Sequence, residues 1–148
     1  MIQASRDNNQ ASTTNSIYAD LYDKMTSLSY KPLIAFKSQL TNKTKHFIAT
    51  TMTTTKKDRY IKLDYHILKD DGETLTGGVI YMGTQEFPYG FYDVTIYQNN
   101  NNTNLDPANA IKVIYKTIMN FKSVNNDAIT YSEYNETITQ PTYITNTI

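Results

Sequence analysis

Hydrophobic and polar residues alternate with a period of two over much of the chain, as in strands that bury one face. The clearest stretch is 89–98, which follows Pro88 and ends at the asparagine run 99–102. Aromatic and β-branched residues fill this stretch, and such side chains favour a pleated, half-buried strand. We therefore predict a central strand here. Its two faces are Tyr92, Val94 and Ile96 on one side, and Phe91, Asp93, Thr95 and Tyr97 on the other.

A second clear alternation covers residues 59–68. Its apolar row should point into a core and its polar row toward solvent, as in a sheet with one buried face. We expect the apolar row to pack against the row that begins at Tyr92. The two rows are Ile61, Leu63, Tyr65 and Ile67 facing inward, and Lys62, Asp64 and His66 facing outward.

Further strand patterns recur about every ten residues, a spacing typical of a β-sandwich or barrel. In 110–121 the apolar residues fit both a helix and a strand, and the β-branched residues favour the strand. Gly77 and Gly78 indicate a bulge or bend. We predict an all-β fold, a single antiparallel β-sandwich of about eight strands, immunoglobulin-like or jelly-roll-like. The remaining predicted strands are 33–37, 44–53, 75–82, 128–135 and 142–145.

The N-terminal residues are expected to form an arm, so that the chain divides into an arm, 1–30, and a β-sandwich domain, 31–148. Residues 1–16 are small and polar, and alone they cannot bury enough apolar surface to offset the entropy of ordering. Apolar residues in 17–28 recur at helical spacing, which leaves a short amphipathic helix and an extended arm both open. This apolar stripe would pack either on the domain's own sheet or on a neighbouring subunit. Removing 1–28 should then leave the domain folded.

Partner contacts are expected at apolar side chains that the predicted core does not use. The second face of 89–98 is unusually apolar for a surface that meets water, and the polar loop 99–109 is long enough to make contacts. Either the arm or a neighbouring subunit should cover that face. The predicted contact residues are Ile17, Leu21, Tyr22, Met25 and Leu28 in the arm, and Phe91, Tyr97 and Leu105 in the domain.

The composition narrows the function. The 148 residues include 14 Lys and Arg and 14 Asp and Glu, so the net charge gives no broad attraction to nucleic acid or anionic membranes. The absence of Cys excludes disulfides, thiolate metal ligands and a cysteine nucleophile. No apolar run approaches the roughly 20 residues that cross a bilayer, and the start lacks a signal-peptide pattern. We expect no membrane association, and synthesis in a cytoplasm.

Few side chains could carry chemistry. His66 and Asp64 share the outward side of one predicted strand, but two ligands without a third do not make a metal site, and a solvated sheet face explains them. His46 lies in a polar patch. Lys and aromatic residues in 43–60 would suit single-stranded nucleic acid on an OB-like barrel, which the neutral net charge disfavours. No phosphate loop, nucleophile elbow or dinucleotide fingerprint occurs. We therefore expect no enzyme, no catalytic residue, no cofactor and no metal.

Four stretches together resemble a loose family of small tailed-phage virion proteins. Members share a tyrosine-rich strand that opens with a glycine, a polar loop after it, and a late Tyr-Asn-Glu, at 134–136 here. The likeness covers roughly 31–143 and leaves the N-terminal residues unmatched. This chain differs in having Asp93 where an aromatic is common, and Thr117 or Asn120 where a glycine would stand. The stretches are 40–45, 59–63, 89–98 and 104–107.

The resemblance implies a β-sandwich structural component of a phage particle, without catalytic residues. The expected function is a non-enzymatic capsid decoration protein, an auxiliary or cement protein that binds the major capsid protein or other virion subunits. It would form a homo-oligomer or occupy many positions on a lattice, and it would be found in the virion after synthesis in the host cytoplasm. A neck, tail or baseplate component, and a carbohydrate- or receptor-binding β-sandwich at the tail, stay open as alternatives. Nucleic acid is not the expected partner.

Overall fold

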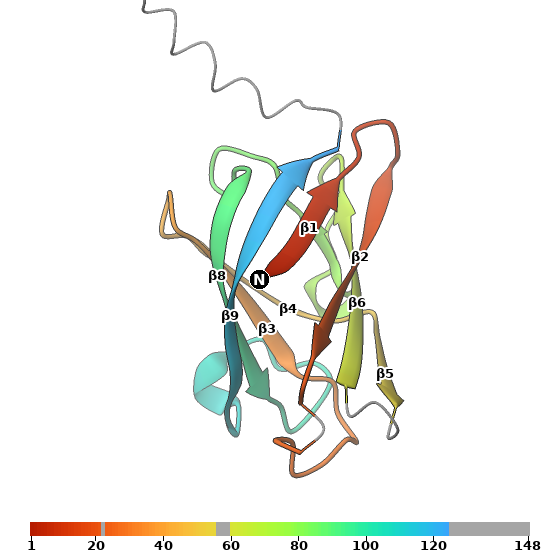
Figure 1. The fold of residues 1–148 in the computed structure, drawn as a ribbon, viewed down its shortest axis with the longest axis vertical. Coiled ribbons are helices and arrows are strands. Elements are labelled where there is room, and N and C mark those ends of the chain that lie inside the picture. The colour runs from red at the N-terminus through yellow and green to blue at the C-terminus, as the bar shows by residue number, and fades with distance from the viewer. Residues whose placement is uncertain (22, 56–59, 125–148) are drawn as a thin grey trace, which may run out of the picture.

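Strands with one buried and one open side form two packed sheets, as the computed structural model shows (Figure 1). The structure describes residues 1–21, 23–55 and 60–124, except for the side chain of Thr55. The predicted all-β sandwich is confirmed: the described residues contain nine strands and no α-helix. The strands are β1 (Ile2–Arg6), β2 (Ser12–Ala19), β3 (Leu33–Ser38), β4 (Thr44–Ile48), β5 (Thr51–Thr55), β6 (Tyr60–Leu68), β7 (Val79–Tyr81), β8 (Gly90–Gln98) and β9 (Lys112–Ser123).

Sheet A has the strand order β1-β9-β8-β3-β4, and sheet B has the order β2-β6-β5, with β7 also paired to β6. Most neighbours run antiparallel, as predicted. Two pairs are parallel, β1 with β9 and β6 with β7. Two short 3₁₀ turns, η1 (Leu75–Gly77) and η2 (Pro107–Asn109), lie in the connections. In Figure 1, β8 and β9 lie on the left, and β2, β6 and β5 lie on the right.

The core lies between the two apolar rows that the sequence predicts. All seven side chains of these rows are buried and belong to one cluster, so the predicted packing is confirmed. Phe36 of β3 links the two rows, because its ring centroid lies 5.6 Å from that of Tyr65 and 6.4 Å from that of Tyr92. Tyr65 donates its hydroxyl hydrogen to the Met119 sulfur at 3.8 Å, and burial raises the pKa of Tyr65.

The N-terminal residues do not form the expected arm. β1 is an edge strand of sheet A, and β2 is an edge strand of sheet B. The Asn15 side chain joins them, since it accepts from the Ser5 backbone N–H and donates to the Ser5 carbonyl, both at 2.9 Å. The prediction that residues 1–16 lack order alone overlooked these long-range partners. Because residues 1–28 supply a strand to each sheet, removing them would not leave the sandwich intact.

The stretch 44–53, predicted as one strand, is two strands in different sheets. Buried Ala49 and neighbouring Thr50 carry the chain from β4 to β5. Gly78 passes so close to this crossover that an added Cβ would lie 2.2 Å from the Thr50 nitrogen, and its φ of 72° is left-handed. Only glycine fits at position 78, which explains the second glycine of the pair. The predicted strand 75–82 is correspondingly shorter, and consists of η1 followed by β7.

The predicted strands 128–135 and 142–145 lie outside the described residues. The last described contact of the chain is a hydrogen bond from the Val124 backbone N–H to the Arg6 carbonyl, at 3.0 Å. This bond extends the pairing of β9 with β1 one residue beyond the end of β9. Among the described residues, no helix is long and apolar enough to cross a membrane.

Candidate interaction face

The outer face of sheet A is the side of β3, β4, β8 and β9 that points away from the core. A shallow groove of about 420 Å³ runs along it. The strand register builds the groove, because Ala35 pairs with both His46 and Thr95, and Thr95 pairs with Lys116. The small side chain of Ala35 lowers the floor between its larger neighbours. The polar lining consists of Lys37, Thr44, His46, Asp93, Thr95, Tyr97, Lys116 and Thr117.

The charges of this groove are mostly uncompensated. Lys37 and Lys116 are exposed, and neither ammonium group has a carboxylate within ion-pair distance in the described part of the chain. Asp93 accepts a hydrogen bond from the Gln39 side-chain amide at 2.9 Å. Burial lowers the pKa of His46, and the Asp106 carboxylate partly opposes that shift. At neutral pH the groove therefore presents two ammonium groups beside one carboxylate and a neutral imidazole.

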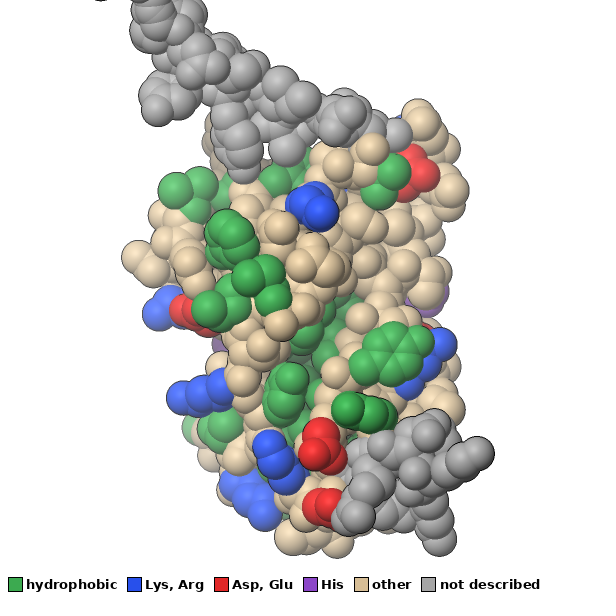
Figure 2. Space-filling view, in the orientation of Figure 1, with side chains coloured by type: hydrophobic (Ala, Val, Ile, Leu, Met, Phe, Trp, Pro, Cys, Tyr) green, Lys and Arg blue, Asp and Glu red, His purple; other side chains and the backbone are tan. Residues whose placement is uncertain are grey.

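Exposed apolar side chains adjoin the groove on β8 and β9. Phe91 is 49% exposed, Val113 is 46% exposed and Ile118 is 42% exposed. Figure 2 shows hydrophobic side chains gathered over the region where these two strands lie. Isolated apolar side chains on a surface are common, but neighbouring ones, such as Phe91 and Ile118 across β8 and β9, are typical of a contact surface.

The loop between β8 and β9 covers the other end of the outer face. Leu33 and Ile48 pair across β3 and β4 on the outward side, yet both are fully buried. Half-buried Leu105 shares a hollow with His46 at this end, and the Asn102 side chain accepts from the Lys31 backbone N–H at 2.9 Å. The predicted contact residue Leu105 thus packs partly on its own sheet.

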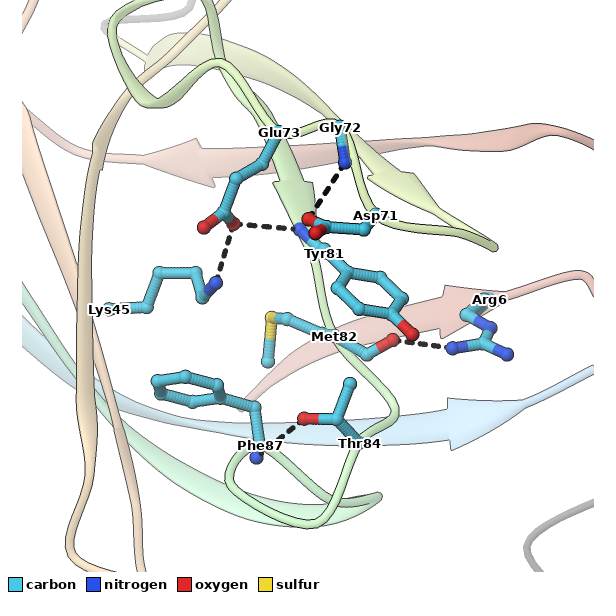
Figure 3. Close-up of polar contacts among 9 residues, drawn as sticks. All are labelled: Arg6, Lys45, Asp71, Gly72, Glu73, Tyr81, Met82, Thr84 and Phe87. Carbon is cyan, nitrogen blue, oxygen red and sulfur yellow. Dashed lines mark hydrogen bonds and ion pairs between the residues drawn. The ribbon is translucent and has the colours of Figure 1, made fainter.

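The β4 edge of sheet A carries a charged side chain that points inward. Lys45 of β4 is 8% exposed and forms an ion pair with Glu73 at 2.5 Å (Figure 3). Its ammonium group also lies 4.6 Å from the centre of the Phe87 ring. Glu73 in addition accepts from the Tyr81 backbone N–H. An inward-pointing charge on an edge strand disfavours pairing with another strand, so contacts should use the face of this sheet rather than its β4 edge.

The polar side chains at the centre of the outer face of sheet B bond to one another, while the rings of Tyr18 and Tyr60 are exposed on the same face. Asp64 lies in one row with Ser16 and Thr51, and accepts from their hydroxyl groups at 2.5 and 3.0 Å. The hydrogen bond from Ser16 is the main cause that lowers the pKa of Asp64. His66 forms a hydrogen bond with Thr14 at 3.1 Å. Asp64 and His66 therefore act within the sheet, in agreement with the solvated-face interpretation.

The structure separates the predicted contact residues into two groups. Ile17, Leu21 and Met25 are buried in the chain's own core, which supports the alternative that this stripe packs on its own sheet. Leu28 packs against the same core, and Tyr22 lies outside the described residues. The others, Phe91, Tyr97 and Leu105, lie on the sheet A side of the domain, with Phe91 the most exposed.

Sequence reasoning missed the Lys45–Glu73 pair and the covered Leu33–Ile48 pair. The signal for the first was a charged residue at an inward position of an alternating strand. No group of three or more metal-ligating side chains occurs among the residues that the structure describes. Comparison with known proteins found no matching family model and no matching curated protein.

Proposed function

We propose that this chain is a non-enzymatic structural protein that binds neighbouring subunits through the outer face of sheet A, and that the assembly is a phage particle. The observation that supports subunit binding is the pair of exposed apolar side chains Phe91 and Ile118, which are diagonal neighbours on β8 and β9. Next to Ile118 on the same side of β9 lies Lys116, which has no carboxylate within ion-pair distance among the described residues, and exposed Val113 follows beyond it. Apolar side chains at the centre of a patch with polar groups around it are typical of protein interfaces. The phage assignment rests on the resemblance of the tyrosine-rich strand and its following loop.

The face can be tested with a pair of serine substitutions. Phe91→Ser with Ile118→Ser should lower co-sedimentation with purified particles at least tenfold, because the apolar contacts are lost. The matched control is Tyr18→Ser with Tyr60→Ser on the outer face of sheet B, where both rings are also exposed. Equal co-sedimentation of the two double variants would contradict the proposed face.

Copy number then decides the place in the particle. Mass spectrometry of purified particles, calibrated on the major capsid protein, should find hundreds of copies for a capsid decoration protein. About a dozen copies or fewer would instead indicate the neck, tail or baseplate. Absence from the particles would contradict the phage assignment altogether.

A second candidate function is carbohydrate binding in the groove. The hydroxyl groups of Thr44, Thr95 and Tyr97, with the adjacent lysines, offer the donors and acceptors that a sugar needs. Binding of the isolated protein to a glycan array, lost in Tyr97→Ala but kept in Tyr18→Ala, would support this function. An array without binding would contradict it.

A further inference from the structure

The chain itself contains a segment that matches the outer face of sheet A. All 14 Lys and Arg residues precede residue 125, whereas the segment 125–148 holds Asp127, Glu133 and Glu136 and no basic residue. The rest of the chain therefore carries an excess of three positive charges, and this segment an excess of three negative charges. Opposite net charges of two regions favour their association and steer the encounter.

The side-chain pattern of the segment repeats that of the face. On β9, Ile118 and Lys116 both point outward, and Phe91 of β8 pairs with Asn120 just beyond them. The face thus presents two apolar positions followed by a positive one, with steps of about 6.6 Å along the strand. In an extended segment, Ile129, Tyr131 and Glu133 would share one side and present two apolar positions followed by a negative one, with the same step.

The segment cannot reach this face easily on its own chain. A tight turn after Val124 would place the returning strand in the plane of sheet A, but β1 and β8 already occupy both sides of β9. A strand that passes over the face must stand off by about 10 Å. Reaching the level of Asn120 then needs a straight path of about 16 Å, whereas five extended residues to Ile129 span about 17 Å. No residue is left to make the reversal.

We propose that residues 128–136 of one copy dock on the outer face of sheet A of a second copy. This inference rests on the proposed function and names the partner of its binding face. Ile129 and Tyr131 cover Phe91 and Ile118, and Glu133 pairs with Lys116. Each copy donates one segment and accepts another through unlike surfaces, so the contact is head-to-tail and produces rings or chains of subunits.

Exchange of the charges between the two surfaces tests this arrangement on the full-length chain. Lys116→Glu alone and Glu133→Lys alone should each weaken self-association about tenfold in sedimentation velocity, because like charges then meet. An equimolar mixture of the two variants should associate as the unaltered protein does, since each segment finds a face of opposite charge on the other variant. The association of the unaltered protein should also weaken with added salt. Lys69→Glu makes the same charge change at an exposed site beyond β6 and should have no effect.

Each contrary result overturns the proposal. An unaltered protein that stays monomeric at high concentration, or a mixture that associates no better than its components, would show that the segment does not dock on a second copy. Restored packing only when both substitutions share one chain would place the segment on its own sheet instead. The proposed function fails separately: Phe91→Ser with Ile118→Ser would then leave particle binding unchanged. Loss of particle binding in that variant, without any effect of the charge variants, would keep the face and overturn only the identity of its occupant.

Discussion

The outer faces of the two sheets differ in how their polar side chains find hydrogen-bond partners. On sheet B, Asp64 joins Ser16 and Thr51 across three strands, so that one row of polar side chains satisfies itself. On sheet A, the equivalent central strand presents Asp93 between Lys37 and Ile118, and no side-chain bond crosses from β8 to β9 on this side within the described residues. Polar groups that already have hydrogen-bond partners within their sheet gain little free energy when another protein binds. Polar groups without such partners can still form hydrogen bonds and ion pairs with a bound protein.

The largest loss of stability is expected at the β4 edge of sheet A, where Lys45 lies. Lys45→Ala would leave the Glu73 carboxylate, which is 30% exposed, without its ion pair and would empty space beside Phe87. We expect a loss of about 3 kcal/mol in the free energy of unfolding, as for a mostly buried pair that loses one partner. Urea denaturation followed by circular dichroism measures it. A loss below about 0.5 kcal/mol would show that the β4 edge does not depend on this charge.

The next effect separates the two faces directly. Asp64→Ala should cost about 1.5 kcal/mol of stability, because two hydroxyl groups lose a charged acceptor. The matched change on sheet A, Asp93→Ala, removes only an exposed bond from Gln39 and should cost less than about 0.5 kcal/mol. Equal losses in urea denaturation would remove the contrast between the faces.

Acid should erase the contribution of Asp64 specifically. Its pKa is lowered from the ordinary value of 3.8, mainly by the hydrogen bond from Ser16. A lowered pKa in the folded state means that the stabilisation is complete above the ordinary value and is lost as the pH falls through the folded value. The difference in stability between the unaltered protein and Asp64→Asn should therefore be larger at pH 7 than at pH 2. A difference independent of pH would assign the effect to packing.

The smallest effect on stability is expected for the double variant that should weaken binding most. Phe91→Ser with Ile118→Ser should change the free energy of unfolding by only about 0.5 kcal/mol, since both side chains lie on the surface, with exposed fractions of 49% and 42%. Thermal melting monitored by circular dichroism measures it. A loss of several kcal/mol would mean that these side chains hold the fold, and their proposed role as a binding surface would lose its basis.

Local alternation was sufficient to predict the central strands β6 and β8, because the apolar side chains of their inward rows are buried and the side chains between them are not. At residues 17–21 alternation did not decide between a helix and an extended strand, because Ile17 and Leu21 are four positions apart and fit both. Buried Asn15 and Ala19 complete the period of two, but a polar and a small residue carry little hydrophobic signal. β1 could not be predicted locally at all, since its partner is β9 at the other end of the described chain.

The face was predictable only in part. Alternation placed Phe91 and Tyr97 on the second side of β8, and the structure agrees. The lysines of the groove come from β3 and β9, and only the strand order brings Lys37 and Lys116 to one surface. Similarly, Lys45 and Glu73 meet because β4 and the segment before β7 lie side by side at the edge, which no spacing in the sequence reveals.

The pairing of Ile2 with Met119 has a consequence for how the protein is made. During synthesis β1 emerges early, yet it has no partner until β9 has left the ribosome. Sheets that depend on such distant contacts fold slowly and expose unpaired strands meanwhile. The nascent chain must therefore stay soluble while the edge of β1 is unpaired, and sheet A can be completed only after β9 has been synthesised.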